Sequence, residues 1–329
     1  MSESPILITG GAGFIGNHLL RAWVDQYPHY HFVNVDLLTD ASNIKGLAVL
    51  TNRSNYSFYQ YDICNKEQLE NLFKNYEFEG VIHLAAETHV DKSIVNPRLF
   101  ADSNIIGTVN LLELTKQYCQ TKSSFNRFYH ISTDEVYGHL GLSGCFKESD
   151  RYLPRSPYAA SKAASDHFVR AFYHTYGLPI VLSHCTNNFG PYQSRDKFIP
   201  QIVTNALNHQ PIKIYGQGKN IRDWLYVTDH VQAIDCIYHY GTIGETYHIG
   251  GNNPINNISL ANKITTLMES ILNREKREFQ KLITFVPDRL GHDFRYALDL
   301  SKTQKEIKWN PTTTLEDGLM KTILHYINH

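Results

Sequence analysis

Short apolar runs alternate with longer segments of helical periodicity through the first half of the chain. The runs are rich in β-branched and aromatic residues, which is typical of strands buried on both faces. Five strands are predicted, at Ile6–Thr9, Phe32–Val35, Tyr56–Tyr59, Val81–Leu84 and Phe128–Ile131. Helices are predicted between and after them, at 14–26, 66–76, 98–120 and 157–176.

This alternation predicts an α/β fold with a doubly wound parallel (Rossmann) sheet, because parallel neighbours need crossover helices. After about residue 186 the pattern changes to loops rich in Asn, Pro and Gly, with a last helix at 315–327. We therefore predict a Rossmann domain over 1–186 that also takes back about 222–245, and a smaller mixed α/β substrate lobe over 187–329. Ligands of such a sheet bind at the carboxyl ends of its strands.

Composition narrows the possible functions. A formal net charge of −1 over 329 residues argues against nucleic acid or an anionic membrane as a partner. No apolar run approaches the roughly 20 residues that cross a bilayer, and Met1–Ser4 lead into a strand rather than a signal peptide, so we expect a cytoplasmic protein. The five cysteines form no CxxC pair and the 17 histidines lack HxH or HExxH spacing, which predicts free thiols and no metal site.

A glycine-rich loop follows the first strand directly. Gly10, Gly13 and Gly16 would allow a tight turn, close approach of a pyrophosphate and packing of the next helix on the strand. Asp36 ends the second strand, where a carboxylate can bind ribose hydroxyls and repel a 2′-phosphate, so NAD is predicted over NADP. Further cofactor contacts are predicted from Phe14, Ile15, Asp62, Ile63, Leu84, Ala85 and Ala86. The residues after the third and fourth strands could equally be strand caps or packing filler.

Tyr158 and Lys162 lie four residues apart in a predicted helix, so both project from one face. A nearby ammonium is expected to lower the pKa of Tyr158 toward the range of a general base. The tyrosine could then take a hydroxyl proton while hydride leaves the same carbon for nicotinamide. Thr133, at the end of the fifth strand, offers a hydroxyl to hold the reacting oxygen. The alternative for Thr133 is a helix N-cap.

Five longer segments of the chain resemble the sequence of a known enzyme family. They are Leu84–Ser93, Ser132–Gly138, Asn187–Tyr192, Ile221–His230 and Asp288–Tyr296. Over essentially its whole length the chain resembles the extended short-chain dehydrogenases/reductases, and within them the nucleotide-sugar 4,6-dehydratases of the dTDP-glucose type. The resemblance implies a lyase that converts dTDP-glucose to dTDP-4-keto-6-deoxyglucose with NAD, and a homodimer through the helices at 98–120 and 157–176.

Asp134 and Glu135 suit this chemistry. Once C4 of the sugar is a ketone, a carboxylate can remove the C5 proton while a neutral carboxylic acid protonates the departing C6 oxygen. Closely placed carboxyl groups push their pKa values apart. Both can reach one sugar only from a turn beyond the strand, because adjacent strand residues face opposite ways. The resemblance implies that Asp134 is the acid and Glu135 the base; for such a pair alone, a solvated turn is the alternative.

The resemblance also implies a set of substrate contacts. These are Asn187, Lys197, Arg222, Asn257, Arg289 and His292; apart from the resemblance, Thr133 is predicted to hold the reacting oxygen and Tyr215 could stack on the base. Arg222 suits a diphosphate because its guanidinium can bond bidentately, although a local ion pair with Asp223 is the alternative. Tyr215 could equally be an ordinary core or surface tyrosine.

Two loops depart from the family pattern and leave other functions open. They are Leu37–Ser42, where relatives generally carry glycine at Ser42, and Ser194–Asp196, so UDP-glucose stays the second candidate substrate. A nucleotide-sugar epimerase or decarboxylase would keep Tyr158 and Lys162 without needing the acid pair. A non-catalytic nucleotide-sensing module would predict loss of either residue, and both are present.

Overall fold

The computed structural model describes residues 4–121 and 125–328. The prediction that Met1–Ser4 are not part of a signal peptide falls on residues of which only Ser4 is described. A seven-stranded parallel sheet has the strand order β10-β6-β5-β4-β1-β2-β3. Its strands are β1 (Ser4–Thr9), β2 (Tyr30–Val35), β3 (Tyr56–Tyr59), β4 (Gly80–His83), β5 (Arg127–Thr133), β6 (Ile180–Cys185) and β10 (Thr246–Ile249). The five predicted strands are confirmed within about two residues at each end, and β6 and β10 were not predicted.

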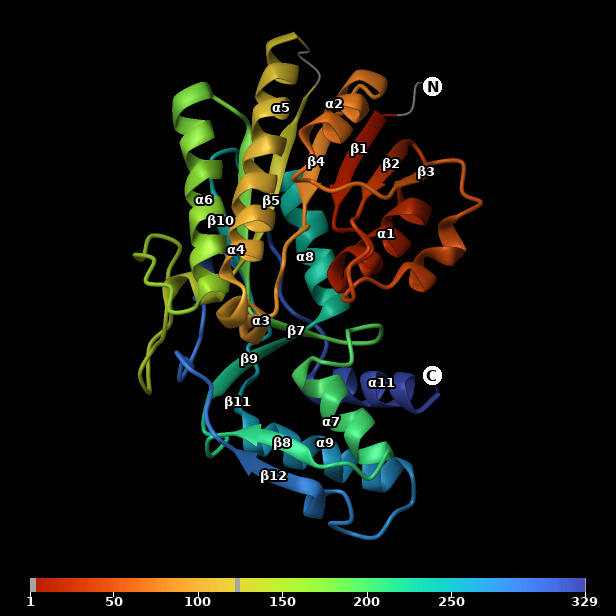
Figure 1. The fold of residues 1–329 in the computed structure, drawn as a ribbon, viewed down its shortest axis with the longest axis vertical. Coiled ribbons are helices and arrows are strands. Elements are labelled where there is room, and N and C mark those ends of the chain that lie inside the picture. Colours follow the sequence, from red (N-terminus) through yellow and green to blue (C-terminus); the bar gives the residue numbers. More distant parts are fainter. Residues whose placement is uncertain (1–3, 122–124, 329) are drawn as a thin grey trace.

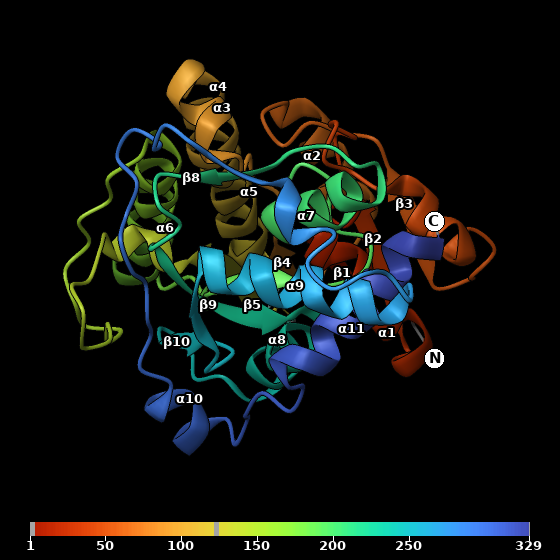
Figure 2. The same ribbon diagram turned by 90° about the horizontal axis from the view of Figure 1, so that it is seen from below.

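Helices cover both faces of this sheet (Figures 1 and 2). On one face lie α1 (Phe14–Gln26) and α8 (Val227–Tyr240), and on the other lie α2 (Lys66–Asn75), α5 (Gly107–Thr121) and α6 (Pro157–Tyr176). α6 begins where the Ser156 side chain accepts from the Ala159 N–H and Pro157 occupies the first turn, and it ends at Gly177 with φ 68°. These are the usual start and stop signals of a helix. The doubly wound fold class is therefore confirmed.

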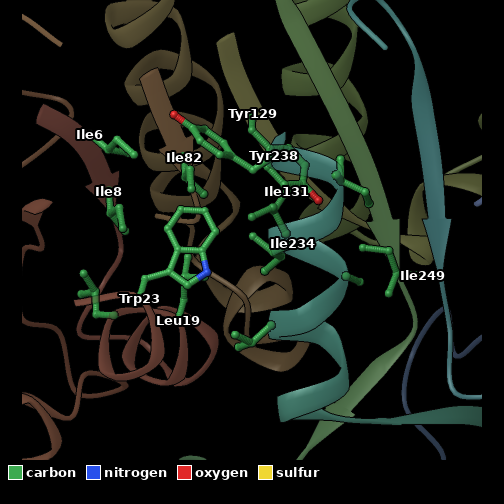
Figure 3. Packing of buried hydrophobic residues seen from close by; sticks show 14 of the residues in the cluster. Ile6, Ile8, Leu19, Trp23, Ile82, Tyr129, Ile131, Ile234, Tyr238 and Ile249 are labelled. Atoms are coloured by element: carbon green, nitrogen blue, oxygen red, sulfur yellow. The ribbon is translucent and has the colours of Figure 1, made fainter. Parts of the chain in front are cut away.

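The core between the sheet and the helices α1 and α8 is dominated by one indole (Figure 3). Trp23 on α1 is fully buried and packs edge-on against Tyr238 of α8, with ring centroids 5.3 Å apart. Strand residues such as Ile6 and Ile82 complete this layer. Burial of large apolar side chains on both faces stabilises the sheet. The packed sheet holds the carboxyl ends of its strands in place, and ligands of this fold bind at those ends.

The predicted helix at 98–120 is not a single α-helix. It is divided into α4 (Pro97–Phe100), a π-helical turn η2 (Ala101–Ile106) and α5. The wide turn directs Asn104 inward, where its side chain accepts from the Glu87 N–H (2.8 Å) and donates to the Glu87 carbonyl (3.0 Å) and to Ser161 Oγ (2.8 Å). These bonds explain the departure, since π-helical turns re-aim single side chains near functional sites.

The carboxyl-terminal part forms a smaller mixed lobe below the main sheet (Figure 1). Strand β9 pairs in parallel with β7 and antiparallel with β11, while β8 and β12 form a parallel pair. This confirms the mixed α/β lobe. Its strands and helices are β7 (Asn187–Phe189), α7 (Phe198–Leu207), β8 (Ile212–Tyr215), β9 (Ile221–Tyr226), β11 (Pro254–Asn256), α9 (Asn257–Ile271), β12 (Ile283–Val286) and α11 (Leu315–Asn328). Helix α10 (Ser301–Glu306) packs on β10, and α3 (Val90–Val95) precedes α4.

The chain returns to the main sheet through α8 and β10, after β9 has paired within the smaller lobe. The predicted division into a Rossmann domain over 1–186, which also includes about 222–245, and a substrate lobe over 187–329 stays a prediction. Among the described residues, no helix is long and apolar enough to cross a membrane.

Candidate active site

A cavity of about 330 Å³ lies at the carboxyl ends of the main strands and reaches the first residues of the smaller lobe. This is the edge at which a doubly wound sheet binds its ligand. The cavity gathers most residues predicted from the sequence: Gly10, Gly13, Phe14, Ile15, Gly16, Asp36, Asp62, Ile63, Leu84, Ala85, Ala86, Thr133, Asp134, Glu135, Tyr158, Lys162, Asn187 and Lys197. Five predicted residues do not line it: Tyr215, Arg222, Asn257, Arg289 and His292.

The glycine loop forms a backbone cradle at one end of this cavity. Gly10 has φ +75°, and a Cβ there would lie 2.5 Å from the backbone nitrogen of Ala85, so no other residue fits without a shift. Gly13 begins α1 without a side-chain cap. The first N–H groups of a helix lack intrahelical partners and favour an anion. This donor set fits the pyrophosphate of a dinucleotide.

Asp36 stands beside the cradle with its carboxylate already held. Its Oδ2 accepts from the Ala12 N–H, and its Oδ1 accepts from the Leu38 N–H and from Ser42 Oγ, each at 2.9 Å. The side chain is almost fully buried, but it lines the cavity and keeps lone pairs for ribose hydroxyls. Ser42, one of the departures from relatives, thus orients the carboxylate that was predicted to favour NAD.

Tyr158 and Lys162 lie side by side on the first turns of α6, and both are buried. The Lys162 ammonium donates to the Ile131 carbonyl at 3.0 Å. Burial raises the pKa of Tyr158 well above its ordinary value, Glu135 adds to this, and a hydrogen bond with Thr133 opposes it. The expected lowering of the Tyr158 pKa is therefore wrong, because burial of the phenolate has the largest effect and raises the pKa.

Asp134 and Glu135 lie in a 3₁₀ turn, η3 (Asp134–Tyr137), directly after β5. Thr133 caps this turn by accepting from the Glu135 N–H (3.3 Å) and donates to Asp134 Oδ1 (3.2 Å). The predicted turn geometry is confirmed, and Thr133 is an N-cap as well as a cavity residue. Unlike the solvated turn weighed as the alternative, the Asp134 side chain is buried and both carboxyl groups line the cavity.

The two carboxyl groups have different electrostatic surroundings. Burial, followed by the charge of Glu135, raises the pKa of Asp134 well above its ordinary value. Burial also raises the pKa of Glu135, but Arg222, Arg289 and Lys197 oppose the rise. Arg222 opposes the rise in pKa at both groups, but Arg289 and Lys197 act on Glu135, so Asp134 holds a proton more tightly.

Arg222 approaches the pair from β9, although it does not line the cavity. It donates to the carbonyls of Ile221 (2.8 Å) and Asp293 (2.9 Å), and its guanidinium lies 4.4 Å from the Tyr296 ring centroid. The alternative ion pair does not form among the described atoms, since the Asp223 carboxylate accepts from backbone N–H groups instead.

The other predicted substrate residues lie at the outer rim. Arg289 pairs with Asp91 at 2.6 Å and stacks on Tyr215, with 5.0 Å from its guanidinium carbon to the ring centroid. His292 pairs with Asp288 at 2.6 Å. Asn257 begins α9, and its N–H donates to the Asn220 carbonyl. None of these side chains reaches into the cavity, so their substrate roles stay predictions.

Several cavity residues were not predicted from the sequence. Glu87 and Thr88 directly follow the predicted cofactor contacts Leu84, Ala85 and Ala86, so their position in the chain could have indicated them. Asn188, Gln193 and Cys185 lie in or beside the Asn-rich connection to the smaller lobe and carry no such signal. All five cysteines are free thiols. Within 4–121 and 125–328, no cluster of three or more metal-ligating side chains occurs.

Comparison with known proteins agrees with this geometry. The profile of the family described as GDP-mannose 4,6 dehydratase matches residues 7–322. A dTDP-glucose 4,6-dehydratase of Neisseria meningitidis is 45% identical over 336 residues, which cover 98% of this chain and 93% of that protein.

Solved structures give the same result. A dTDP-glucose 4,6-dehydratase of Streptomyces venezuelae with NAD bound has a TM-score of 0.90 at 37% identity, covering 98% of this chain and 97% of that one. The enzyme of the same name from Bacillus anthracis, in complex with NAD, has a TM-score of 0.87 at 40% identity, covering 99% and 97%. The similarity therefore extends over both lobes.

Proposed function

The chain belongs to the GDP-mannose 4,6-dehydratase family, and from this premise we propose that it removes water from dTDP-glucose to give dTDP-4-keto-6-deoxyglucose, with NAD as its cofactor. One observation carries the proposal. The carboxyl pair Asp134 and Glu135 lines the same cavity as Tyr158 and Lys162. Redox groups alone would serve an epimerase, whereas an additional acid and base are what an elimination requires.

NAD fits the cradle at Gly10, Gly13 and the start of α1, with its adenosine ribose at Asp36. When bound, it accepts hydride from C4 of the sugar and returns hydride to C6 within one turnover. Lys162 is held by the Ile131 carbonyl at the end of β5, where it can also bond the nicotinamide ribose. Asp62, Ile63 and the small residues Leu84–Ala86 supply the remaining walls.

Tyr158 is proposed as the base of the redox step, taking the proton of the C4 hydroxyl while Thr133 holds the same oxygen. Burial raises the pKa of Tyr158, so the phenolate needs positive charge close by. Lys162, one helical turn further along α6, supplies it from a fixed position. A buried and preorganised charge stabilises a developing anion more than a solvated charge does.

Elimination is assigned to the turn after β5. Glu135 takes the C5 proton, and Asp134 donates a proton to the C6 oxygen as the C6–O bond breaks, so that water leaves. The higher tendency of Asp134 to keep its proton supports this order of roles. Lys197, which lines the cavity, supplies positive charge for the diphosphate, and Arg222 adds positive charge near Glu135 from outside the cavity lining.

Incubation of the purified protein with dTDP-glucose, without added reductant, tests the proposal. We expect the alkaline absorbance of a 4-keto sugar and a product lighter by one water, with no net NADH. Tyr158→Phe serves as the control for adventitious activity. Turnover of UDP-glucose instead would keep the mechanism and change the substrate. If neither dTDP-glucose nor UDP-glucose reacts, the proposal is overturned and an epimerase or decarboxylase is favoured.

We further propose a homodimer in the cytoplasm. Large apolar side chains are exposed between α3 and α6: Val95 on α3 at 86%, Leu99 on α4 at 43%, Ile106 in η2 at 50%, and Phe168 and Tyr176 on α6 at 41% and 54%. Exposed apolar surface of this kind often marks a protein interface. Light scattering at micromolar concentration should give twice the chain mass, and a monomer would contradict the dimer.

A further inference from the structure

A buried carboxylate that the proposed mechanism does not use lies one helical turn beyond Lys162. Asp166 follows Lys162 by four residues and Tyr158 by eight on α6, so the three side chains share one face of the helix. The Asp166 side chain has no exposed surface. A buried charge is costly unless its surroundings supply hydrogen bonds and opposite charge.

Four donors from different parts of the chain converge on Asp166. Its Oδ1 accepts from His130 Nε2 at 3.1 Å. Its Oδ2 accepts from Ser132 Oγ (3.0 Å), His184 Nε2 (3.0 Å) and the Tyr152 hydroxyl (3.1 Å). Burial alone would raise the pKa of Asp166, but the hydrogen bonds from His130 and His184 hold it below its ordinary value. The carboxylate is therefore ionised at neutral pH.

Lys162 lies beside this network, with Nζ 3.5 Å from His130 Nε2. Because that nitrogen donates its hydrogen to Asp166, it cannot also accept from the ammonium, so Asp166 acts on Lys162 through its charge. Burial lowers the pKa of Lys162, and Asp166 is the strongest influence that raises it. An uncompensated lysine in this position would lose its proton more easily, and the cation beside Tyr158 would be lost with it.

The other titratable groups around Asp166 and Lys162 do not replace this negative charge. Burial lowers the pKa of His130 to about 4 and that of His83 and His184 below the ordinary value, so these imidazoles are neutral. Burial raises the pKa of Cys185 to about 12. Outside these lie Tyr137 and Tyr152 with raised pKa values, His248 with a lowered pKa, the cation Arg170, and Glu148, whose pKa is raised by burial.

We propose that Asp166 is a positioning residue for the redox step, whose buried carboxylate keeps Lys162 cationic beside Tyr158, while the Ile131 carbonyl holds the ammonium in place. The kinetic part of this inference rests on the proposed function. It assigns a role to the third member of the stripe Tyr158, Lys162 and Asp166, which would otherwise be an unexplained buried charge.

The pH dependence of turnover tests the charge. Asp166→Asn removes it, so Lys162 loses its proton at lower pH, and the alkaline limb of the profile should move down by about one pH unit or more. Asp166→Glu keeps the charge and should keep the position of the limb. Ser183→Ala, a buried hydroxyl change on β6 outside the network, is the matched control. An equal loss of rate at every pH, with an unmoved limb, would overturn the proposal.

A stability measurement covers the case in which Asp166→Asn does not fold. Thermal unfolding is compared for Asp166→Asn, Lys162→Met and the double variant. If the two charges compensate each other, the double variant should lose less than the sum of the single losses, since it leaves no unpaired buried charge. Additive losses, or a double variant that fails to fold, would overturn the pairing. This cycle needs no turnover, so its failure is distinguishable from failure of the proposed function.

Discussion

The two sides of the cavity are built in different ways. On the cofactor side, Tyr158, Lys162 and Asp166 are buried on one helix and bonded to strands of the main sheet. On the side proposed for the nucleotide sugar, polar groups pair at the outer rim: His89 with Asp196 at 3.2 Å, Asp91 with Arg289 at 2.6 Å, and Lys197 with the Thr88 carbonyl at 3.4 Å. The side chains of Asp196 and Asp91 are 44% and 37% exposed.

This difference separates rigidity from adaptability. Removal of one partner from a buried charged pair lowers the free energy of unfolding by several kcal/mol, whereas a partly exposed ion pair contributes only about 0–1 kcal/mol to it. If the nucleotide sugar binds on the outer side as proposed, its diphosphate can replace these pairs at little cost, whereas the groups proposed for the redox step already have buried partners.

The strongest perturbation of the rigid side is Tyr158→Phe. Without its hydroxyl, no base remains for the C4 proton, and general-base catalysis is typically worth about 10²–10⁴-fold in rate. We expect kcat to fall by that amount while NAD binding is retained, because the ring and Lys162 stay in place. Stopped-flow absorbance of NADH measures the step directly. Oxidation at the normal rate would contradict the role of Tyr158.

Glu135→Gln should separate the two half-reactions. The amide cannot take the C5 proton, so we expect C4 oxidation to continue and NADH to accumulate, while product forms about 10²–10⁴-fold more slowly. Because burial raises the pKa of Glu135, the wild-type elimination rate should rise with pH above the range of an ordinary carboxylate, and the variant should lack this limb. Normal product formation by the variant would show that another group is the base.

Asp36→Ala tests the edge of the rigid side, where the cofactor ribose is expected. Loss of hydrogen bonds to a charged group costs about 1.5–3 kcal/mol, which corresponds to a 10- to 100-fold weaker affinity for NAD. Ser42→Gly is a milder companion, since it removes one donor to Asp36 and keeps the carboxylate. Calorimetric titration with NAD and NADP measures both. An unchanged NAD affinity would remove Asp36 from the cofactor site.

Asp91→Asn should have the smallest effect, on the adaptable side. The variant frees Arg289 from its partly exposed partner, so dTDP-glucose should bind up to about fivefold more tightly, with kcat unchanged. Asp102→Asn, which breaks the exposed pair with Arg98 elsewhere on the surface, is the matched control. Weaker substrate binding by Asp91→Asn would instead mean that the pair holds the opening in its working shape.

The sequence predicted the rigid side better than the adaptable side for physical reasons. The glycine loop and the pair Tyr158 and Lys162 are local patterns, in which spacing along one element fixes which side chains lie together. The pairing of Asp91 with Arg289 joins positions far apart in the chain, and no periodicity connects them. The raised pKa of Tyr158 could not be predicted from the sequence either, because it depends on burial of the side chain by several elements of the fold. The π-helical turn depends on the partners that Asn104 finds at Glu87 and Ser161.

The turn at Ala101–Ile106 also sets how this helix tolerates insertions and deletions. Each residue of an α-helix advances the chain by about 100° around its axis, and a π-helical turn absorbs one residue without rotating the next helix. Deleting one residue of the turn would therefore restore a regular α-helix and leave the rotation of α4 relative to α5 unchanged. The loss would fall on Asn104, whose bonds to Glu87 and Ser161 depend on the wide turn. The extra residue is therefore needed for the position of this side chain rather than for the packing of the helices, although the sequence alone resembles an ordinary helix.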